Sequence, residues 1–137
     1  MTKEAAVYSW ESLEIYAQTN QFARLLGRLI AALPDRLHVQ VHQLIALTIT
    51  MSNAIAGAHV DVMPGGDPPS SEERFAYLLI GQNAARMATR RLGDLGRDSK
   101  RPEIADGLRL LDLIEAGFRQ DMEKADATSK PDPVHLA

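Results

Sequence analysis

The chain has 137 residues, of which 45% are hydrophobic and 24% are charged, a balance typical of one folded domain rather than of a disordered chain. It contains no cysteine, which excludes disulfide bonds, thiolate zinc sites, iron–sulfur clusters and cysteine nucleophiles. The net charge of −3 gives the chain as a whole no attraction to polyanions. Aromatic residues make up only 5%, which disfavours a β-sandwich and favours a helical domain.

Residues 9–33 carry apolar side chains at intervals of three and four, the spacing that places them on one stripe of an α-helix. Ser9 is the expected N-cap of this helix, because its hydroxyl can accept a hydrogen bond from an unpaired backbone N–H. Pro34 is expected to end the helix. A second helix is expected over residues 36–61, with Asp35 as its N-cap.

Apolar residues cover most of the circumference of this second helix, more than the other helices of a small bundle can cover. Such a helix lies at the centre of a fold or takes part in a second interface, and in a four-helix bundle the second case means association between copies of the chain. We therefore predict a homo-oligomer. Its expected interface consists of Leu44, Leu47, Ile49, Met51 and Ile55.

The segment 62–71 contains three prolines and two adjacent glycines, so it is predicted to be a connecting loop. Ser70 and Glu73 have the spacing of a capping box, which indicates the start of a third helix. We expect this helix to end at Gly93 and Gly96, because glycine commonly adopts the left-handed conformation that terminates helices.

Pro102 suits the first turn of a fourth helix, and the apolar periodicity is lost from residue 125 onward. The chain is therefore expected to divide into an N-terminal extension at 1–8, a four-helix bundle domain at 9–124 and a flexible C-terminal tail at 125–137. The predicted fold class is all-α, a four-helix bundle that forms a homo-oligomer.

The sequence contains no apolar run of the length that a membrane span needs, because residues 25–33 and 44–60 are interrupted by Gly, Arg, Asn or His. Its first residues lack the basic segment and apolar segment of a secretory signal. We therefore expect a cytoplasmic protein without a membrane partner.

Three local features carry a resemblance to a known family: the run Leu13-Glu-Ile-Tyr16, the break at Leu33-Pro34, and the run SNAIAGA at residues 52–58. In these features the chain resembles the four-helix bundle proteins related to 23S rRNA intervening-sequence proteins, a family that is similar to the accessory proteins of diversity-generating retroelements. The resemblance covers about residues 9–124 as an arrangement of helices.

This resemblance implies an up-down-up-down bundle that assembles as a ring, often a pentamer, with proposed nucleic-acid or protein binding and no catalysis. The chain departs from the family pattern at Ala56, where the family has an acidic residue, and at Leu44 and Ile45, where it has a basic pair. The apolar pair puts the family's RNA binding in doubt and enlarges the apolar area available to a subunit contact.

His38 and His42 are four residues apart, so on a helix both rings project from one face and could bind one metal ion. Two ligands are too few for a metal site, and the sequence has no HExxH or Glu-x-x-His pattern. We therefore interpret both as polar surface histidines and expect no metal and no cofactor.

Glu11 and Glu14 form a Glu-x-x-Glu pair, the half-site with which some all-α nucleotide pyrophosphohydrolases hold Mg²⁺. The second half-site would have to come from residues 103–106 or 123–126, in the fourth helix rather than in the adjacent one. Acidic residues in a first turn also interact favourably with the helix dipole without any metal. A Mg²⁺-dependent pyrophosphohydrolase is therefore the last-ranked alternative.

Basic residues concentrate between residues 86 and 109, where seven positive and four negative side chains give a local charge of +3. A surface of this kind, repeated in an oligomer, could hold a phosphate backbone. The other interpretation is a solvated mixed face without aromatic side chains for base stacking. The candidate nucleic-acid contacts are Arg86, Arg90, Arg91, Arg97, Lys100 and Arg101.

The sequence has no phosphate-binding loop, no Gly-x-Ser-x-Gly elbow and no glycine-rich dinucleotide turn. No catalytic residue is therefore predicted. We expect a non-enzymatic homo-oligomeric bundle that works as an interaction or scaffold module. A nucleic-acid-binding accessory protein is the first alternative.

Overall fold

The computed structural model describes residues 13–60, 67 and 69–129. In this part of the chain all regular structure is helical: α2 (Glu14–Ala32), the short 3-10 helix η2 (Asp35–Leu37), α3 (His38–Ala58), α4 (Ser71–Asp98) and α5 (Pro102–Ser129). The predicted all-α architecture with four helices is confirmed for the described residues.

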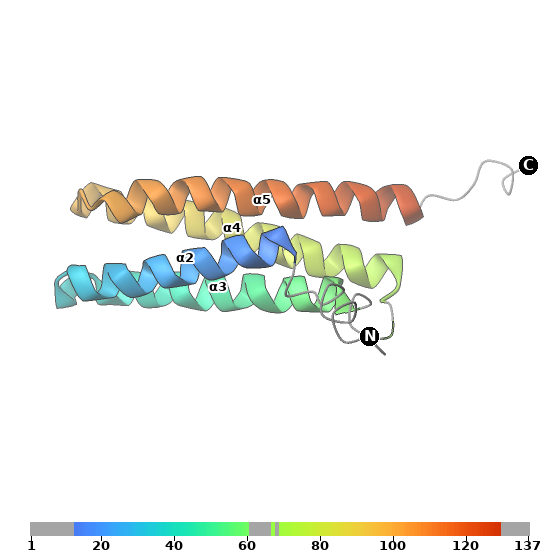
Figure 1. Cartoon of the computed structure of the whole chain (residues 1–137), viewed down its shortest axis with the longest axis horizontal. Helices are drawn as coiled ribbons and strands as arrows, with labels where there is room; N and C mark the ends of the chain where they lie inside the picture. The colour runs from blue at the N-terminus through green and yellow to red at the C-terminus, as the bar shows by residue number, and fades with distance from the viewer. Residues whose placement is uncertain (1–12, 61–66, 68, 130–137) are drawn as a thin grey trace, which may run out of the picture.

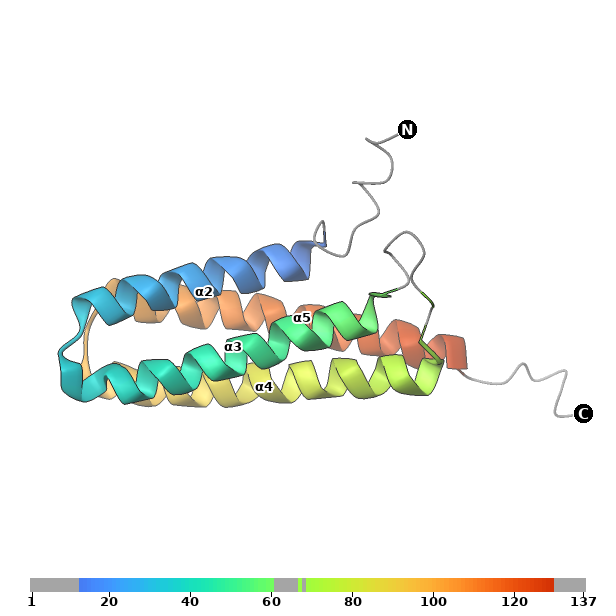
Figure 2. The same cartoon turned by 90° about the horizontal axis from the view of Figure 1, so that it is seen from below.

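Consecutive helices run in opposite directions along one common axis (Figure 1). Each helix packs against the next one in the chain, and α5 also packs against α2, so every helix has two neighbours. Figure 2 shows the bundle from below, with α3 lying along α4. The side formed by α3 and α4 is therefore opposite the side formed by α2 and α5.

One continuous apolar core runs between the four helices, and every helix contributes to it. Burial of a leucine or phenylalanine side chain contributes about 1.5–3 kcal/mol, so this core is the main source of stability. Its largest fully buried side chains are Phe22, Leu25, Leu26, Leu29, Leu44, Met51, Ile55, Leu78, Leu92, Leu95, Leu111 and Phe118.

Gly81 allows Phe118 of α5 to pack directly on the backbone of α4. A β-carbon built at Gly81 would lie 2.3 Å from two carbons of the Phe118 ring, far inside van der Waals contact. The ring is fully buried in a close-packed core, so it has little space into which to move. A residue without a side chain is therefore required at position 81.

Several helix ends follow local signals. The hydroxyl of Ser70 accepts a hydrogen bond from the Glu73 backbone N–H at 3.1 Å, and the Ser70 N–H donates to the Glu73 carboxylate at 3.4 Å, which confirms the predicted capping box. Pro34 follows α2 and Pro102 opens α5, as predicted. These ends are local in origin, because each depends on residues within one helical turn.

Three predicted details are corrected. Asp35 does not cap the second long helix: it lies in η2, and Leu37 is the N-cap of α3 without a side-chain hydrogen bond. The helix does not end at Gly93 or Gly96 but continues to Asp98, because both glycines keep helical backbone and buried apolar side chains extend the stripe to Leu95.

The third correction concerns the predicted tail. Helix α5 extends to Ser129, and Ala125 is still buried, so the boundary predicted at residue 125 falls inside the helix. The expected cap at Ser9, the extension at 1–8 and most of the loop at 62–71 lie outside the described residues.

The contact at Gly81 predicts the effect of adding one methyl group. Gly81→Ala should lower the free energy of unfolding by about 1–3 kcal/mol, because the fully buried Phe118 ring must shift to admit the β-carbon. Urea unfolding followed by circular dichroism measures this change.

Gly93→Ala is the matched control, because nothing lies within 4 Å of its β-carbon position on the same helix. It should raise stability by about 0.5–1 kcal/mol through helix propensity. Equal effects of the two substitutions would contradict the packing argument.

Candidate functional site

Helix α3 carries no Asp, Glu, Lys or Arg in its 21 residues. The segment Asp35–Ala58 is long and apolar enough to cross a membrane by length and composition, a test that the core helix of a bundle also passes. Only 39% of its most apolar window is buried in the bundle, however. The rest of this apolar stretch is half-buried or exposed, and an exposed side without charges is unusual for a helix.

The predicted interface residues separate into two groups. Leu44, Met51 and Ile55 are fully buried in the core of the single chain. This part of the predicted interface is corrected: these side chains lie on the inward stripe of α3 and present no surface to a second copy. Leu47 is partly buried against the core, whereas Ile49 is 56% exposed.

The solvent side of α3 carries an exposed stripe that shares only Ile49 with the predicted set. Val39, His42, Ala46, Ile49 and Asn53 are all exposed and follow one another at intervals of three, four, three and four residues. This alternation is the heptad spacing with which helices form seams against other helices. Val39 is the most exposed large apolar residue of the stripe, at 66%.

Helix α4 contributes a second exposed apolar stripe. Tyr77, Ile80 and Met87 are exposed and lie at intervals of three and seven residues, which places them on one side of the helix. No charged residue occurs in the range 75–85 of this helix.

This stripe borders α3 at both of its ends. The Tyr77 ring lies against Gly57, where an added β-carbon would be 2.6 Å from the ring. Arg91, one turn beyond Met87, donates a hydrogen bond from Nη1 to the Gln43 side-chain oxygen at 2.7 Å. The two stripes therefore belong to the same side of the bundle. We call this surface the α3/α4 face; its members are Val39, His42, Ala46, Ile49, Asn53, Tyr77, Ile80 and Met87.

The six predicted nucleic-acid contacts do not share one surface. Arg86 reaches Glu115 of α5 at 3.1 Å, whereas Arg91 points to the other neighbour, α3. Arg97 lies 3.7 Å from Asp94 of its own helix.

The remaining predicted contacts lie further along the chain. Arg101 pairs with Glu103 at 3.1 Å, at the start of α5. Arg90 and Lys100 are exposed. The local charge of +3 is therefore spread around two helices and largely paired with carboxylates.

The two predicted histidines have different surroundings. His38 donates from Nε2 to the Leu33 carbonyl oxygen at 2.9 Å and lies 3.7 Å from Asp35, whereas His42 is exposed on α3. Among the described residues no group of three or more His, Cys, Asp or Glu side chains could hold a metal ion.

The predicted carboxylate half-sites are also separate. Glu11 lies outside the described residues, and Glu14 is exposed and accepts a hydrogen bond from Gln18 at 3.5 Å. The carboxylate of Glu103 contacts Arg101, just before α5, and that of Asp106 contacts Arg109 of the same helix. The pyrophosphohydrolase alternative therefore gains no support from the described residues.

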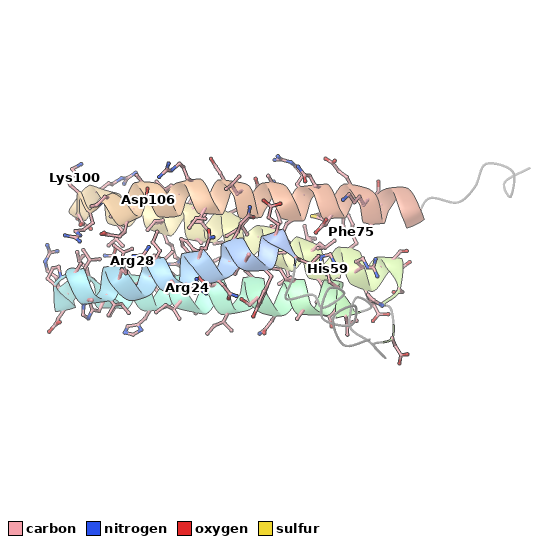
Figure 3. The ribbon with its side chains drawn as sticks, in the orientation of Figure 1. Arg24, Arg28, His59, Phe75, Lys100 and Asp106 are labelled. Carbon is pink, nitrogen blue, oxygen red and sulfur yellow. The ribbon has the colours of Figure 1, made fainter. Side chains whose placement is uncertain are left out.

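His59 and Asp121 form a pair that sequence reasoning did not find, because 62 residues separate them. The His59 Nε2 atom lies 3.2 Å from Asp121 Oδ2, and the side chains are only 16% and 24% exposed. They border a cavity of about 280 Å³ at the end of the bundle, between α3, α4 and α5. His59 is labelled in Figure 3. The contact connects the end of α3 to α5.

Sequence reasoning also missed Arg24 and Arg28, which lie on α2 beside a groove that α2 forms with α5. Their only sequence signal is the spacing of four residues on a helix that has no nearby carboxylate.

No protein-family model, curated protein or solved structure matches this chain.

The pair of His59 and Asp121 predicts non-additive stability effects. His59→Ala and Asp121→Ala should each lower the free energy of unfolding, and the double variant should cost about 1 kcal/mol less than the sum of the two, because their shared hydrogen bond is lost only once. Thermal unfolding of the four proteins in this cycle measures the coupling. Asp112→Ala, at an exposed position of α5, is the control. Strict additivity would contradict the contact.

Proposed function

We propose that this protein is a non-enzymatic interaction or scaffold module that associates with copies of itself through the α3/α4 face. The observation that carries the proposal is the exposed heptad stripe of α3, on a helix that contains no charged side chain. Surface helices of monomers normally place charged residues on the side that faces water.

The exposed apolar side chains of this face favour association, because association would remove them from water. Val39, Ile49, Ile80 and Met87 are each more than two-fifths exposed. Burying apolar surface contributes about 25 cal/mol per Å², and the α3 stripe extends about 21 Å at 1.5 Å per residue. This length suits a helix-to-helix contact.

The charge distribution favours a second copy of this chain as the partner. The net charge of −3 makes two copies repel weakly at a distance, but the exposed stripe of α3 adds no charge to this repulsion when two copies meet. A partner recognised through opposite charge would need charged residues on this face, and α3 supplies none.

Two closed arrangements are compatible with this face. Packing of α3 on the same helix of a second copy is isologous and closes as a dimer. Packing of α3 on a different surface is heterologous and closes as a ring, the arrangement that the family resemblance implies.

The proposal predicts that the protein has a mass above that of one chain in solution, and that one substitution in the α3/α4 face dissociates the oligomer. Light scattering at micromolar concentration should give a multiple of 15.0 kDa. Ile49→Asp should raise the dissociation constant at least about tenfold, because it places an unpaired charge in the contact. Ile49 is a better position for this substitution than Leu47, because Leu47 also packs against the core and its replacement would affect folding.

Leu79→Asp is the matched control, because Leu79 is an exposed leucine of α4 outside the stripe of Tyr77, Ile80 and Met87. It should leave the mass unchanged. A wild-type mass of 15.0 kDa at all concentrations would contradict the proposal, as would equal dissociation by both variants.

Nucleic-acid binding through Arg86 and Arg90 is less well supported, because Arg86 is paired with Glu115 and the six predicted contacts are dispersed. Fluorescence anisotropy with labelled RNA and DNA should show weak binding at most, and none at physiological salt. The double variant Arg86→Glu with Arg90→Glu should change little. Strong binding that this charge reversal abolishes would reverse the ranking of the two functions.

A further inference from the structure

A groove of about 420 Å³ lies between α2 and α5, on the side of the bundle opposite the α3/α4 face. Each helix lines it with residues at positions i, i+3, i+4 and i+7, which form one stripe on a helix. The α2 stripe is Gln21, Arg24, Leu25 and Arg28, and the α5 stripe is Asp106, Arg109, Leu110 and Leu113. Figure 3 shows Arg24 and Arg28 along α2 and Asp106 on the facing helix.

The charges of this groove are unbalanced. Asp106 is the one carboxylate of its lining, and this carboxylate contacts Arg109 of the same helix. Arg24 and Arg28 are exposed, and no ion pair joins either of them to a described residue. Helix α2 has no acidic residue after Glu14. Two guanidinium groups one helical turn apart therefore have no ion-pair partner in the described part of the chain, and the groove carries more positive than negative charge.

Guanidinium groups on adjacent turns of a rigid helix suit a phosphate group. The planar donors of arginine match phosphate oxygens in a bidentate geometry, and a second arginine four residues away can approach the same group. The apolar part of the lining, Leu25, Leu110 and Leu113, adds a surface on which an organic group can lie. Leu113 is 53% exposed in the absence of such a contact.

The size of the groove and the composition of its lining favour a small ligand over a nucleic-acid strand. Small-molecule sites commonly have volumes of about 300–1,000 Å³, and this groove falls in that range. Its lining has no aromatic side chain on which successive bases could stack.

We propose that the groove between α2 and α5 binds a small organic phosphate, with Arg24 and Arg28 holding the phosphate group and Leu110 and Leu113 contacting the organic part. Arg109 can also contact the phosphate group when its own contact with the Asp106 carboxylate is broken. The α3/α4 face stays accessible in this state, because it lies on the other side of the bundle.

Isothermal titration of the full chain with phenyl phosphate, inorganic phosphate and phenol tests the two halves of this site separately. Phenyl phosphate should bind about tenfold more tightly than either of the others, because only it engages both the arginines and the leucines. Its affinity should fall as salt is added.

Variants assign the binding to the groove. Arg24→Gln and Arg28→Gln should each weaken phenyl phosphate binding about tenfold, because each removes a charge-assisted contact. Asp106→Asn should strengthen it about threefold by removing the competing carboxylate. Arg119→Gln, on α5 outside the groove, is the matched control and should have no effect. All four positions are exposed or at the helix surface, so melting temperatures should stay close to that of the wild type.

Equal affinity for phenyl phosphate and inorganic phosphate would overturn the assignment of the leucines. Binding that survives the Arg24→Gln and Arg28→Gln substitutions would overturn the site. A single-stranded oligonucleotide that binds through these arginines when phenyl phosphate does not would assign the groove to a nucleic-acid backbone instead.

Discussion

Four helices of 19 to 28 residues bury their apolar side chains by packing along one common axis, and the contacts between helices depend on that packing. One close approach in it is between the Phe118 ring and the backbone at Gly81. Beside this contact, Gln82 and Arg86 of α4 both reach the Glu115 carboxylate of α5, at 3.3 and 3.1 Å. The polar contacts at the surface therefore follow from the way the core brings the helices together.

The core also determines which surfaces are left for interactions. Once one side of α3 has been used to bury residues such as Leu44, Met51 and Ile55, Val39 and Ile49 on its other side are left exposed, because the helix has no charged residue to present to water. On the opposite side of the bundle, α2 and α5 place arginines around a groove with a leucine lining. The bundle thus has a side without charged residues along α3 and a basic side along α2, which makes self-association and ligand binding structurally independent proposals.

The dispersal of the basic residues has a simple geometric cause. Successive residues of an α-helix are rotated by about 100°, so charges that are close in sequence are distributed around the helix. Arg86 and Arg91 accordingly contact different neighbours, α5 and α3. The arginines of the groove show the opposite relation, since Arg28 and Arg109 are far apart in sequence and line the same hollow.

The amino-acid sequence by itself determined the helical class, the number of long helices and the helix ends that depend on local chemistry, such as the capping box of Ser70 and Glu73 and the proline at the start of α5. These features are local, because they depend on residues within one or two helical turns. Only the tertiary structure decided which side of α3 faces the core. Apolar residues occur around the whole helix, so their spacing in the sequence does not distinguish a buried side from an exposed one. It also decided that α4 continues through Gly93 and Gly96, that His59 meets Asp121, and that Arg24 and Arg28 face Arg109. Each of these depends on contacts between helices, which no local pattern in the sequence specifies.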